Sequence, residues 1–415
     1  MSFETPPSDE HHDPFDEPVP SASGATSPSS PPSSEQPSGE APKRSNRARE
    51  RHERRKQQAT PRPAGKMPRQ LKVPQNINVP NLNTPRTIPI LLGVIGAVTL
   101  VAIIVYVLGR VRNNPVTAQP NALWLGTEWT YDTHTDAQVA DLVTTLRTQQ
   151  IGTVYAWVSD LQFDGTWRST GQFDKVKAFV KQFTTAYPEG KIYGWISIPV
   201  SDATHPNRLN DVSLQQQVAN FSKQIVTDFG FNGVFVDAEE VSDGDQNYLA
   251  LLRAVRTAVG MDNKISAAIP PDWSPSNADI PLPPQIAPGT EWKKAYKQSV
   301  ALLVDQMAVL VFNSGLSSAS DYSQWVAYQV RTYAQAINEL NTNTDLVFGI
   351  PTFDTKPPSH DSSIENVDSA VNGIKLGMQQ AGTDAASTVT GVAIYGWWTT
   401  KDADWAAFQR DWVQK

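Results

Sequence analysis

Apolar and polar residues follow two regular patterns over residues 121–415 of this 415-residue chain. Eight short apolar runs, rich in valine, isoleucine and aromatic residues, predict strands that are buried on both faces. Longer segments between them carry apolar residues at every third or fourth position, which predicts amphipathic helices. The predicted strands are residues 122–129, 153–159, 191–199, 232–239, 264–271, 306–314, 346–353 and 391–398.

Two of the predicted helices have clear signals at both ends. Ser213 and Asp245 are candidate N-caps, and Gly230 and Gly260 are expected to end the same helices. Eight strand–helix units in succession predict an α/β protein with a single (β/α)₈ TIM barrel. The alternative, a doubly wound open sheet, would carry a glycine-rich phosphate loop after its first strand, and residues 125–133 do not form one.

The first part of the chain has a composition that does not favour a folded core. Residues 1–42 are rich in proline, serine and acidic residues and contain no lysine or arginine, whereas residues 43–72 are basic. Such segments bury too little apolar surface to offset the entropy lost on ordering. We therefore expect residues 1–87 to form a disordered tail. The basic run could bind nucleic acid or anionic lipid, but we favour its interpretation as the cytoplasmic flank of a membrane helix.

An apolar segment without charged residues follows at residues 88–108. At about 1.5 Å per residue its length matches the roughly 30 Å hydrocarbon core of a bilayer, which predicts one transmembrane helix. Positive residues are numerous before it, and only Arg110 and Arg112 follow closely, so the N-terminus is expected in the cytoplasm. Residues 109–120 would then be a linker, and residues 121–415 a domain outside the plasma membrane.

The composition excludes several kinds of chemistry. The chain has no cysteine, which excludes disulfides and thiol catalysis. The histidines of the predicted outer domain, His134, His205 and His360, are widely spaced, so neither a metal nor another cofactor is expected. The net charge of −7 arises despite the basic run in the tail, and the acidic domain that this implies argues against nucleic acid as its partner.

Three carboxylates stand at the end of the fourth predicted strand. The apolar run ending at Val236 is followed by Asp237, Glu239 and Glu240. Because side chains alternate along a strand, Asp237 and Glu239 are expected on the same side as Phe235. If Phe235 faces the barrel interior, both carboxylates lie at the open mouth, where barrel enzymes place their active sites. Glu240 would then point towards the helices or the loop. A capping or ion-pair role for all three is the alternative.

The segment NGVFVDAEE resembles the fourth-strand motif of the family 18 glycoside hydrolases, the chitinase-like barrels. In that family a D-G-x-D-x-D-x-E pattern ends in the catalytic acid. Gly233, Asp237 and Glu239 match this pattern. Asn232 replaces its first aspartate, and Phe235 replaces its middle aspartate. The Asp-x-Glu ending is also similar to that of other barrel glycosidases acting on N-acetylhexosamines, including the family 25 lysozymes.

Three later strands are similar to the same family. The sixth carries Leu310, Phe312 and Asn313 where the family places Met-x-Tyr-Asp, and the segment LVFGIPTF is similar to its seventh strand. The eighth strand of the family usually supplies a tryptophan at the floor of the site. Tyr395 and Trp397 are the candidates here, and alternation predicts that they lie on one side of the strand.

The resemblance implies a retaining, substrate-assisted glycosidase. Glu239 would be its acid/base, and Asp237 would orient the acetamido group of the substrate, which acts as the nucleophile. Because Phe235 and Phe312 depart from the family pattern, a retaining glycosidase with a protein carboxylate as nucleophile stays open. Its candidates, each of a kind more often found in a loop cap or an ion pair, are Glu128, Asp160, Asp272 and Asp354.

Aromatic residues near strand ends are a second indication of sugar binding. An aromatic ring packs on the apolar face of a sugar and leaves the hydroxyls free for hydrogen bonds. Tryptophans near predicted strand ends are Trp129, Trp157, Trp195, Trp273, Trp397 and Trp398. The predicted substrate-binding residues are Trp129, Trp157, Trp195, Trp273, Asn313, Asp354, Tyr395 and Trp397.

Together these patterns predict a membrane-anchored glycosidase that cleaves a glycan of the cell surface or wall, with N-acetylhexosamine as the sugar that the resemblance implies. The first rival is an inactive barrel that only binds glycan, which the substitutions Phe235 and Phe312 favour. The second is a scaffold protein whose cytoplasmic tail is the active part. The sugar, the linkage and the oligomeric state stay open.

Overall fold

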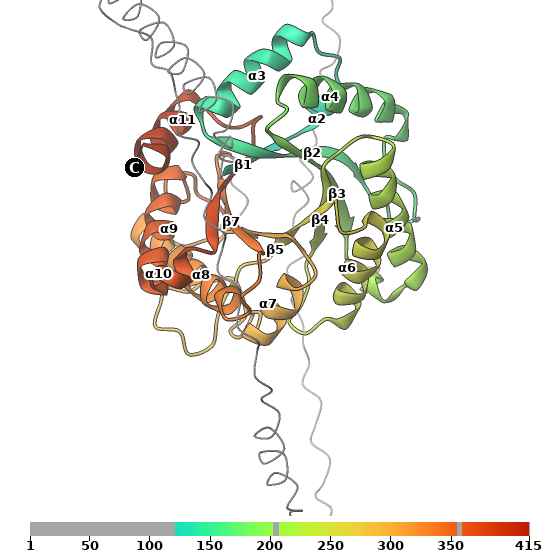
Figure 1. Cartoon of the computed structure of the whole chain (residues 1–415). Helices are drawn as coiled ribbons and strands as arrows, with labels where there is room; N and C mark the ends of the chain where they lie inside the picture. The colour runs from blue at the N-terminus through green and yellow to red at the C-terminus, as the bar shows by residue number, and fades with distance from the viewer. Residues whose placement is uncertain (1–120, 202–206, 355–358, 415) are drawn as a thin grey trace, which may run out of the picture. The chain divides into compact units, whose positions relative to one another are not determined.

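The computed structural model describes residues 121–201, 207–354 and 359–414. Eight parallel strands form a closed barrel in chain order from β1 to β8, which confirms the predicted barrel, and helices surround it on the outside (Figure 1). The strands are β1 (Asn121–Leu125), β2 (Ile151–Asp160), β3 (Lys191–Pro199), β4 (Gly233–Glu239), β5 (Lys264–Ile269), β6 (Gln306–Leu310), β7 (Asp345–Pro351) and β8 (Val389–Tyr395).

The helices follow the strands as the apolar periodicity predicts. They are α2 (Thr127–Thr130), α3 (Asp136–Thr148), α4 (Phe173–Ala186), α5 (Val212–Thr227), α6 (Gln246–Val259), α7 (Lys294–Ala301), α8 (Ala319–Asn338), α9 (Val367–Ala381), α10 (Thr383–Ala386) and α11 (Asp402–Phe408). Short 3₁₀ turns occur at η1 (Thr170–Gln172) and η2 (Arg208–Asn210), and a π-helical turn, η3 (Gln409–Val413), ends the described chain.

Alternation along the strands divides the apolar residues into two cores. On β4, Val234 and Val236 pack outwards against the helices, whereas Phe235 lies in the core inside the barrel. The condition for placing both carboxylates at the mouth, an inward-facing Phe235, is therefore met. Since Asp237 follows Phe235 by two residues in the same strand, its side chain continues the inner row at the carboxyl edge of the barrel.

Several predicted ends of elements differ from the observed ones. The first strand ends at Leu125, and Trp129 lies in α2, because the chain turns at Gly126, whose N–H donates to Oε1 of Glu128 at 3.0 Å. The sixth strand ends at Leu310, before Asn313, and the eighth ends at Tyr395.

The predicted N-cap is confirmed for α6 and wrong for α5. Asp245 caps α6 by accepting the N–H of Asn247 at 2.8 Å, and Gly260 ends the helix with a φ of +80°. The N-cap of α5 is Asp211 and not Ser213, since the carboxylate of Asp211 accepts the N–H of Ser213 at 2.8 Å. An acceptor just before the first turn satisfies a free N–H group that a residue inside it cannot reach.

Several predictions fall outside the described residues. These are the tail at 1–87, the membrane helix at 88–108, the linker at 109–120 and the position of His205. Among the helices that the structure does describe, none has both the length and the apolar character needed to cross a bilayer.

Candidate active site at the carboxyl edge of the barrel

Asp237 is a carboxylate buried inside the end of the barrel. Asp237 is only 3% exposed. Its Oδ2 accepts a hydrogen bond of 2.9 Å from Nε1 of Trp195 on the neighbouring strand β3. Its Oδ1 is buried and has no hydrogen-bond partner in the described part of the chain. Burial raises the pKa of Asp237 to about 7, although the hydrogen bond from Trp195 opposes this rise.

Glu239 ends β4 two residues further along and is partly exposed. Burial of its carboxyl raises its pKa well above the ordinary value, and the negative charges of Asp237 and Glu240 raise it further. Glu240 itself is exposed. A carboxyl whose pKa is raised holds its proton to a higher pH than usual, which suits a general acid.

Aromatic rings from β2, β3 and the end of β8 pack together, and one of them, Trp195, binds the buried carboxylate of Asp237. Trp157 on β2 meets Trp195 edge-to-face at 4.6 Å between ring centroids. Trp195 lies parallel to Trp398 at 6.4 Å, and Trp398 in turn contacts the edge of Tyr395 at 5.2 Å. The structure therefore brings three of the predicted residues, Trp157, Trp195 and Tyr395, into one group with Trp398, which we call the mouth aromatics.

Three of the predicted tryptophans lie elsewhere. Trp129 and Trp397 pack against each other at 5.8 Å in the core between barrel and helices, and Trp273 lies parallel to Trp325 at 5.8 Å in the same core. The expectation that Trp397 and Tyr395 share one side of the strand is wrong. Because β8 ends at Tyr395, alternation does not extend to the residues after it, and Trp398 packs on the inner side instead.

Three of the four candidate nucleophiles are held by positive side chains. Asp160 forms an ion pair with Arg168 at 2.9 Å. Asp354, which is exposed, pairs with Lys401. The remaining one of the three, Asp272, is 1% exposed, pairs with the buried Lys297 of α7 and also accepts the N–H of Trp292 at 2.9 Å.

Glu128, the fourth candidate, lies near Trp398 of the mouth aromatics. A Cβ on Gly126 would come within 2.5 Å of Oε2 of Glu128 and 3.1 Å of Cε3 of Trp398. Both groups therefore approach the same glycine after β1, and an added Cβ there would require the carboxylate of Glu128 to move and would crowd the ring of Trp398.

Asn313 follows the end of β6 in an uncommon backbone conformation. Its φ is +61°, a left-handed value that asparagine tolerates better than most residues. Its N–H donates to Oε2 of Glu365 at 2.6 Å, and its own Oδ1 is buried without a partner among the described residues. The preceding residue, Phe312, packs on Tyr395 at 5.4 Å.

Glu365 and its partner His360 were missed by sequence reasoning. Their only sequence signal is an acidic residue and a histidine in a polar loop, and Glu365 lies 52 residues from the N–H group of Asn313 to which it binds. A contact over that separation leaves no local pattern. Within the described ranges, no group of three or more potential metal ligands comes together.

Comparison with known proteins finds only distant structural likenesses. No protein-family model matches the sequence, and no curated protein matches it. The spore cortex-lytic enzyme SleL of Bacillus cereus is 11% identical, with 70% of this chain and 73% of that chain covered and a TM-score of 0.47. A chitinase of Chromobacterium violaceum is 15% identical, with 71% and 99% covered and a TM-score of 0.47. A chitinase of Bacteroides thetaiotaomicron is 11% identical, with 69% and 92% covered and a TM-score of 0.48. Likenesses of this degree do not establish an activity, which has to be argued from the site itself.

Proposed function

We propose that the chain is a glycoside hydrolase in which Glu239 donates the proton that releases the leaving sugar. The observation that supports this most is the pair of carboxyls at the end of β4, both with raised pKa values and flanked by the mouth aromatics. A general acid has to hold its proton near the working pH. Aromatic rings beside it suit the apolar face of a sugar.

The route we favour is retaining and substrate-assisted. The acetamido oxygen of an N-acetylhexosamine attacks the anomeric carbon as the bond to the leaving oxygen breaks, and that oxygen takes the proton of Glu239. Water then attacks the same carbon, the bond from this carbon to the acetamido oxygen breaks, and the water gives a proton to Glu239, which restores both the acetamido group and the enzyme. Oδ1 of Asp237 has no partner among the described residues, so it is suited to accept the acetamido N–H during the first step.

Two alternative hypotheses each rest on a particular observation. A glycosidase with a protein nucleophile would use Glu128, because this carboxylate lies next to Trp398 at the end of β1. A barrel that binds glycan without cleaving it is favoured by Phe312, which has no hydroxyl with which to hold an acetamido oxygen.

The decisive assay compares the full chain with its Glu239→Gln variant on chitin-type, peptidoglycan-type and neutral glucan or galactan substrates. We expect release of reducing ends by the parent and a fall of about 10²- to 10⁴-fold in the variant, the usual contribution of a general acid. Glu189→Gln is the matched control, because Glu189 pairs with Arg147 and not with any residue of the site. A variant as active as the parent would refute the role of Glu239. Binding without cleavage by both proteins would favour the glycan-binding barrel.

We also propose that the barrel is anchored outside the plasma membrane by residues 88–108, whose apolar character motivates this location. The chain has no cysteine, so single cysteines can report the topology. A membrane-impermeant maleimide should label Val212→Cys, which replaces a 73% exposed residue, in intact cells, and should label Ser30→Cys only after lysis. Labelling of Ser30→Cys alone in intact cells would contradict this orientation.

A further inference from the structure

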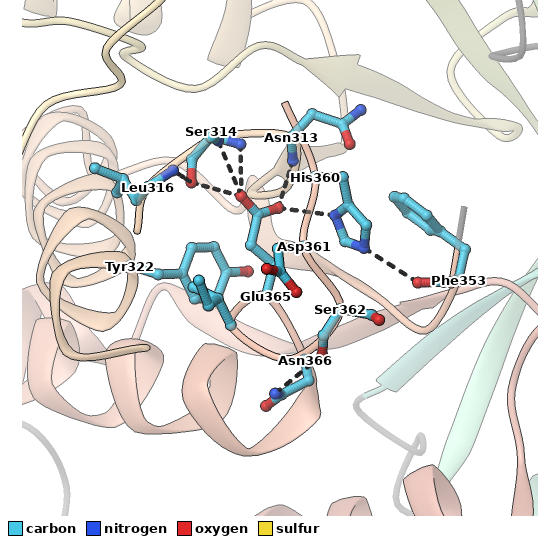
Figure 2. A network of polar contacts seen from close by, with 12 residues as sticks. Asn313, Ser314, Leu316, Tyr322, Phe353, His360, Asp361, Ser362, Glu365 and Asn366 are labelled. Carbon is cyan, nitrogen blue, oxygen red and sulfur yellow. Dashed lines mark hydrogen bonds and ion pairs between the residues drawn. The ribbon is translucent and has the colours of Figure 1, made fainter. Parts of the chain in front are cut away.

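Glu365 is a buried carboxylate that accepts hydrogen bonds from several N–H groups of one loop. It is 1% exposed and lies in the segment before α9. Its Oε2 accepts the N–H of Asn313 at 2.6 Å, and its Oε1 accepts both the N–H and the hydroxyl of Ser314, at 2.8 and 2.6 Å, and the N–H of Gly315 at 3.2 Å (Figure 2). All of these partners are donors, so Glu365 is bound as a carboxylate. It holds the three residues that follow Phe312 at the end of β6.

His360 completes this arrangement from the other side. Its Nδ1 lies 3.0 Å from Oε2 of Glu365, and its Nε2 lies 3.1 Å from the carbonyl oxygen of Phe353 (Figure 2). Both neighbours are acceptors, and an imidazole donates from both nitrogens only when it carries both protons. Each ring nitrogen of His360 that carries a proton can therefore donate to one of these two oxygens, so the ring bridges Glu365 and Phe353.

The pair links the ends of two neighbouring strands. Glu365 binds the loop after β6, and His360 binds Phe353, which follows β7. The imidazole also packs on the ring of Phe353 at 4.2 Å between centroids. Phe353 in turn meets Phe312 edge-to-face at 5.7 Å and lies 6.0 Å from Tyr395 of the mouth aromatics. Hydrogen bonds and ring contacts thus connect the buried pair to the inner wall of the barrel.

We propose that His360 and Glu365 are positioning residues of the active site, which hold Phe312, Asn313 and Phe353 at the ends of β6 and β7 so that the bound glycan is kept in place beside Glu239. This inference rests on the proposed function. Neither residue touches the substrate in this proposal, and both act through the three residues that they fix. A buried ion pair is weak evidence for stability by itself, because apolar residues of similar volume often pack as stably. A role in placing the wall of the site gives the pair a purpose beyond stability.

The test compares kinetics with stability in variants of the full chain. His360→Phe keeps a ring against Phe353 but loses both hydrogen bonds, and Glu365→Gln keeps the shape but loses the charge. Ser314→Ala removes only the hydroxyl bond to Glu365, so it provides a milder variant that tests the same link if the others do not fold. His360→Gln can restore one donor and should recover part of the loss. The matched control is Asp305→Asn, which removes a carboxylate that binds Arg256 and Lys264 in the turn before β6, at the opposite edge of the barrel.

We expect kcat/KM to fall at least about tenfold in His360→Phe and Glu365→Gln, and less in Ser314→Ala. Asp305→Asn should lose comparable thermal stability but keep the kcat and KM of the parent at temperatures where it is folded. Folded variants of His360, Glu365 and Ser314 with the kinetics of the parent would overturn the inference while leaving the proposed glycosidase in place. The same kinetic loss in the Asp305→Asn control would also overturn it.

A failure of the proposed function gives a different result. If the parent cuts no glycan, binding of N-acetylhexosamine oligomers, followed by tryptophan fluorescence, replaces the kinetic comparison. Weaker binding in His360→Phe than in Asp305→Asn would then support positioning in a barrel that only binds. Equal binding in the two variants, or no binding by the parent, would overturn the positioning role as well as the proposed glycosidase function.

Discussion

Asp305 and Asp237 lie at opposite edges of the barrel and differ in how their carboxylates are satisfied. At the amino edge, Asp305 precedes β6 and accepts hydrogen bonds from Arg256, from Lys264 and from the N–H of Ile265. Burial alone would raise its pKa, but the hydrogen bonds from Arg256, Ile265 and Lys264 together outweigh burial and hold it below the ordinary value. This carboxylate is fully used in joining β5 to β6.

At the carboxyl edge, Asp237 is buried more deeply and, among the described residues, has only one donor, the indole N–H of Trp195. Its pKa is raised to about 7. A carboxylate that is buried with an oxygen left over costs stability, whereas one that is surrounded by donors contributes to it. The difference teaches that Asp305 contributes to stability, whereas Asp237 is an unfavourable group of the kind found at functional sites.

The sharpest test of this contrast is the effect of removing each charge on stability. Asp237→Asn should raise the free energy of unfolding at pH 8 by about 2 kcal/mol, because the gain from removing a buried charge exceeds the cost of a buried amide. Asp305→Asn should lower it by about 2–3 kcal/mol through the loss of charged hydrogen bonds. Urea unfolding of the full chain, followed by tryptophan fluorescence, measures both. Two changes of the same sign would break the comparison.

The same experiment carries a pH dependence. Native Asp237 keeps its proton up to about pH 7, whereas an unfolded aspartate loses it near 3.8, so this group makes stability fall as the pH rises between these values. Asp237→Asn should flatten that part of the stability curve. The contribution of Asp305 has the opposite sign, because its lowered pKa adds stability above 3.8 that is lost as the pH falls through the native pKa.

A smaller effect is expected from the single donor to Asp237. Trp195→Phe keeps an aromatic ring beside Trp157 but removes the N–H that favours the ionised carboxylate. The pKa of Asp237 should rise, and the corresponding limb of the pH–rate profile should move to higher pH by on the order of one pH unit, since such a bond contributes about 1.5 kcal/mol. A profile with unchanged limbs and a uniformly lower rate would indicate a packing role only.

The smallest effects separate the two adjacent tryptophans after β8. Trp398→Phe should raise KM by about threefold, because a smaller ring packs less well on a sugar beside Trp195 and Tyr395. Trp397→Phe should leave KM unchanged and cost about 1 kcal/mol of stability, since its ring packs on Trp129 in the outer core. Substrate saturation curves and unfolding curves for both variants check this, and the reverse assignment would move the sugar-binding surface.

The succession of strands and helices along the chain could be predicted because it depends on local sequence patterns. The runs of apolar residues show period 2 in strands and 3.6 in helices, and these periods depend only on backbone geometry. The alternation also predicted that Phe235 and Asp237 lie on one side of the strand, and the structure places Phe235 on the inner side. The predictions that failed lay at the ends of elements, as with Ser213 at the start of α5 and Trp397 after the end of β8, where the regular period stops.

The sequence by itself determined the eight strand–helix units and the strand that carries Asp237 and Glu239, since neighbouring residues decide which face of an element is apolar. Only the tertiary structure decided which side chains those carboxylates meet. It placed Trp195 on Asp237 from 42 residues away and Glu365 on the loop after β6 from 52 residues away. Such contacts form when the barrel closes, and closure depends on the packing of all eight strands together and not on any local period.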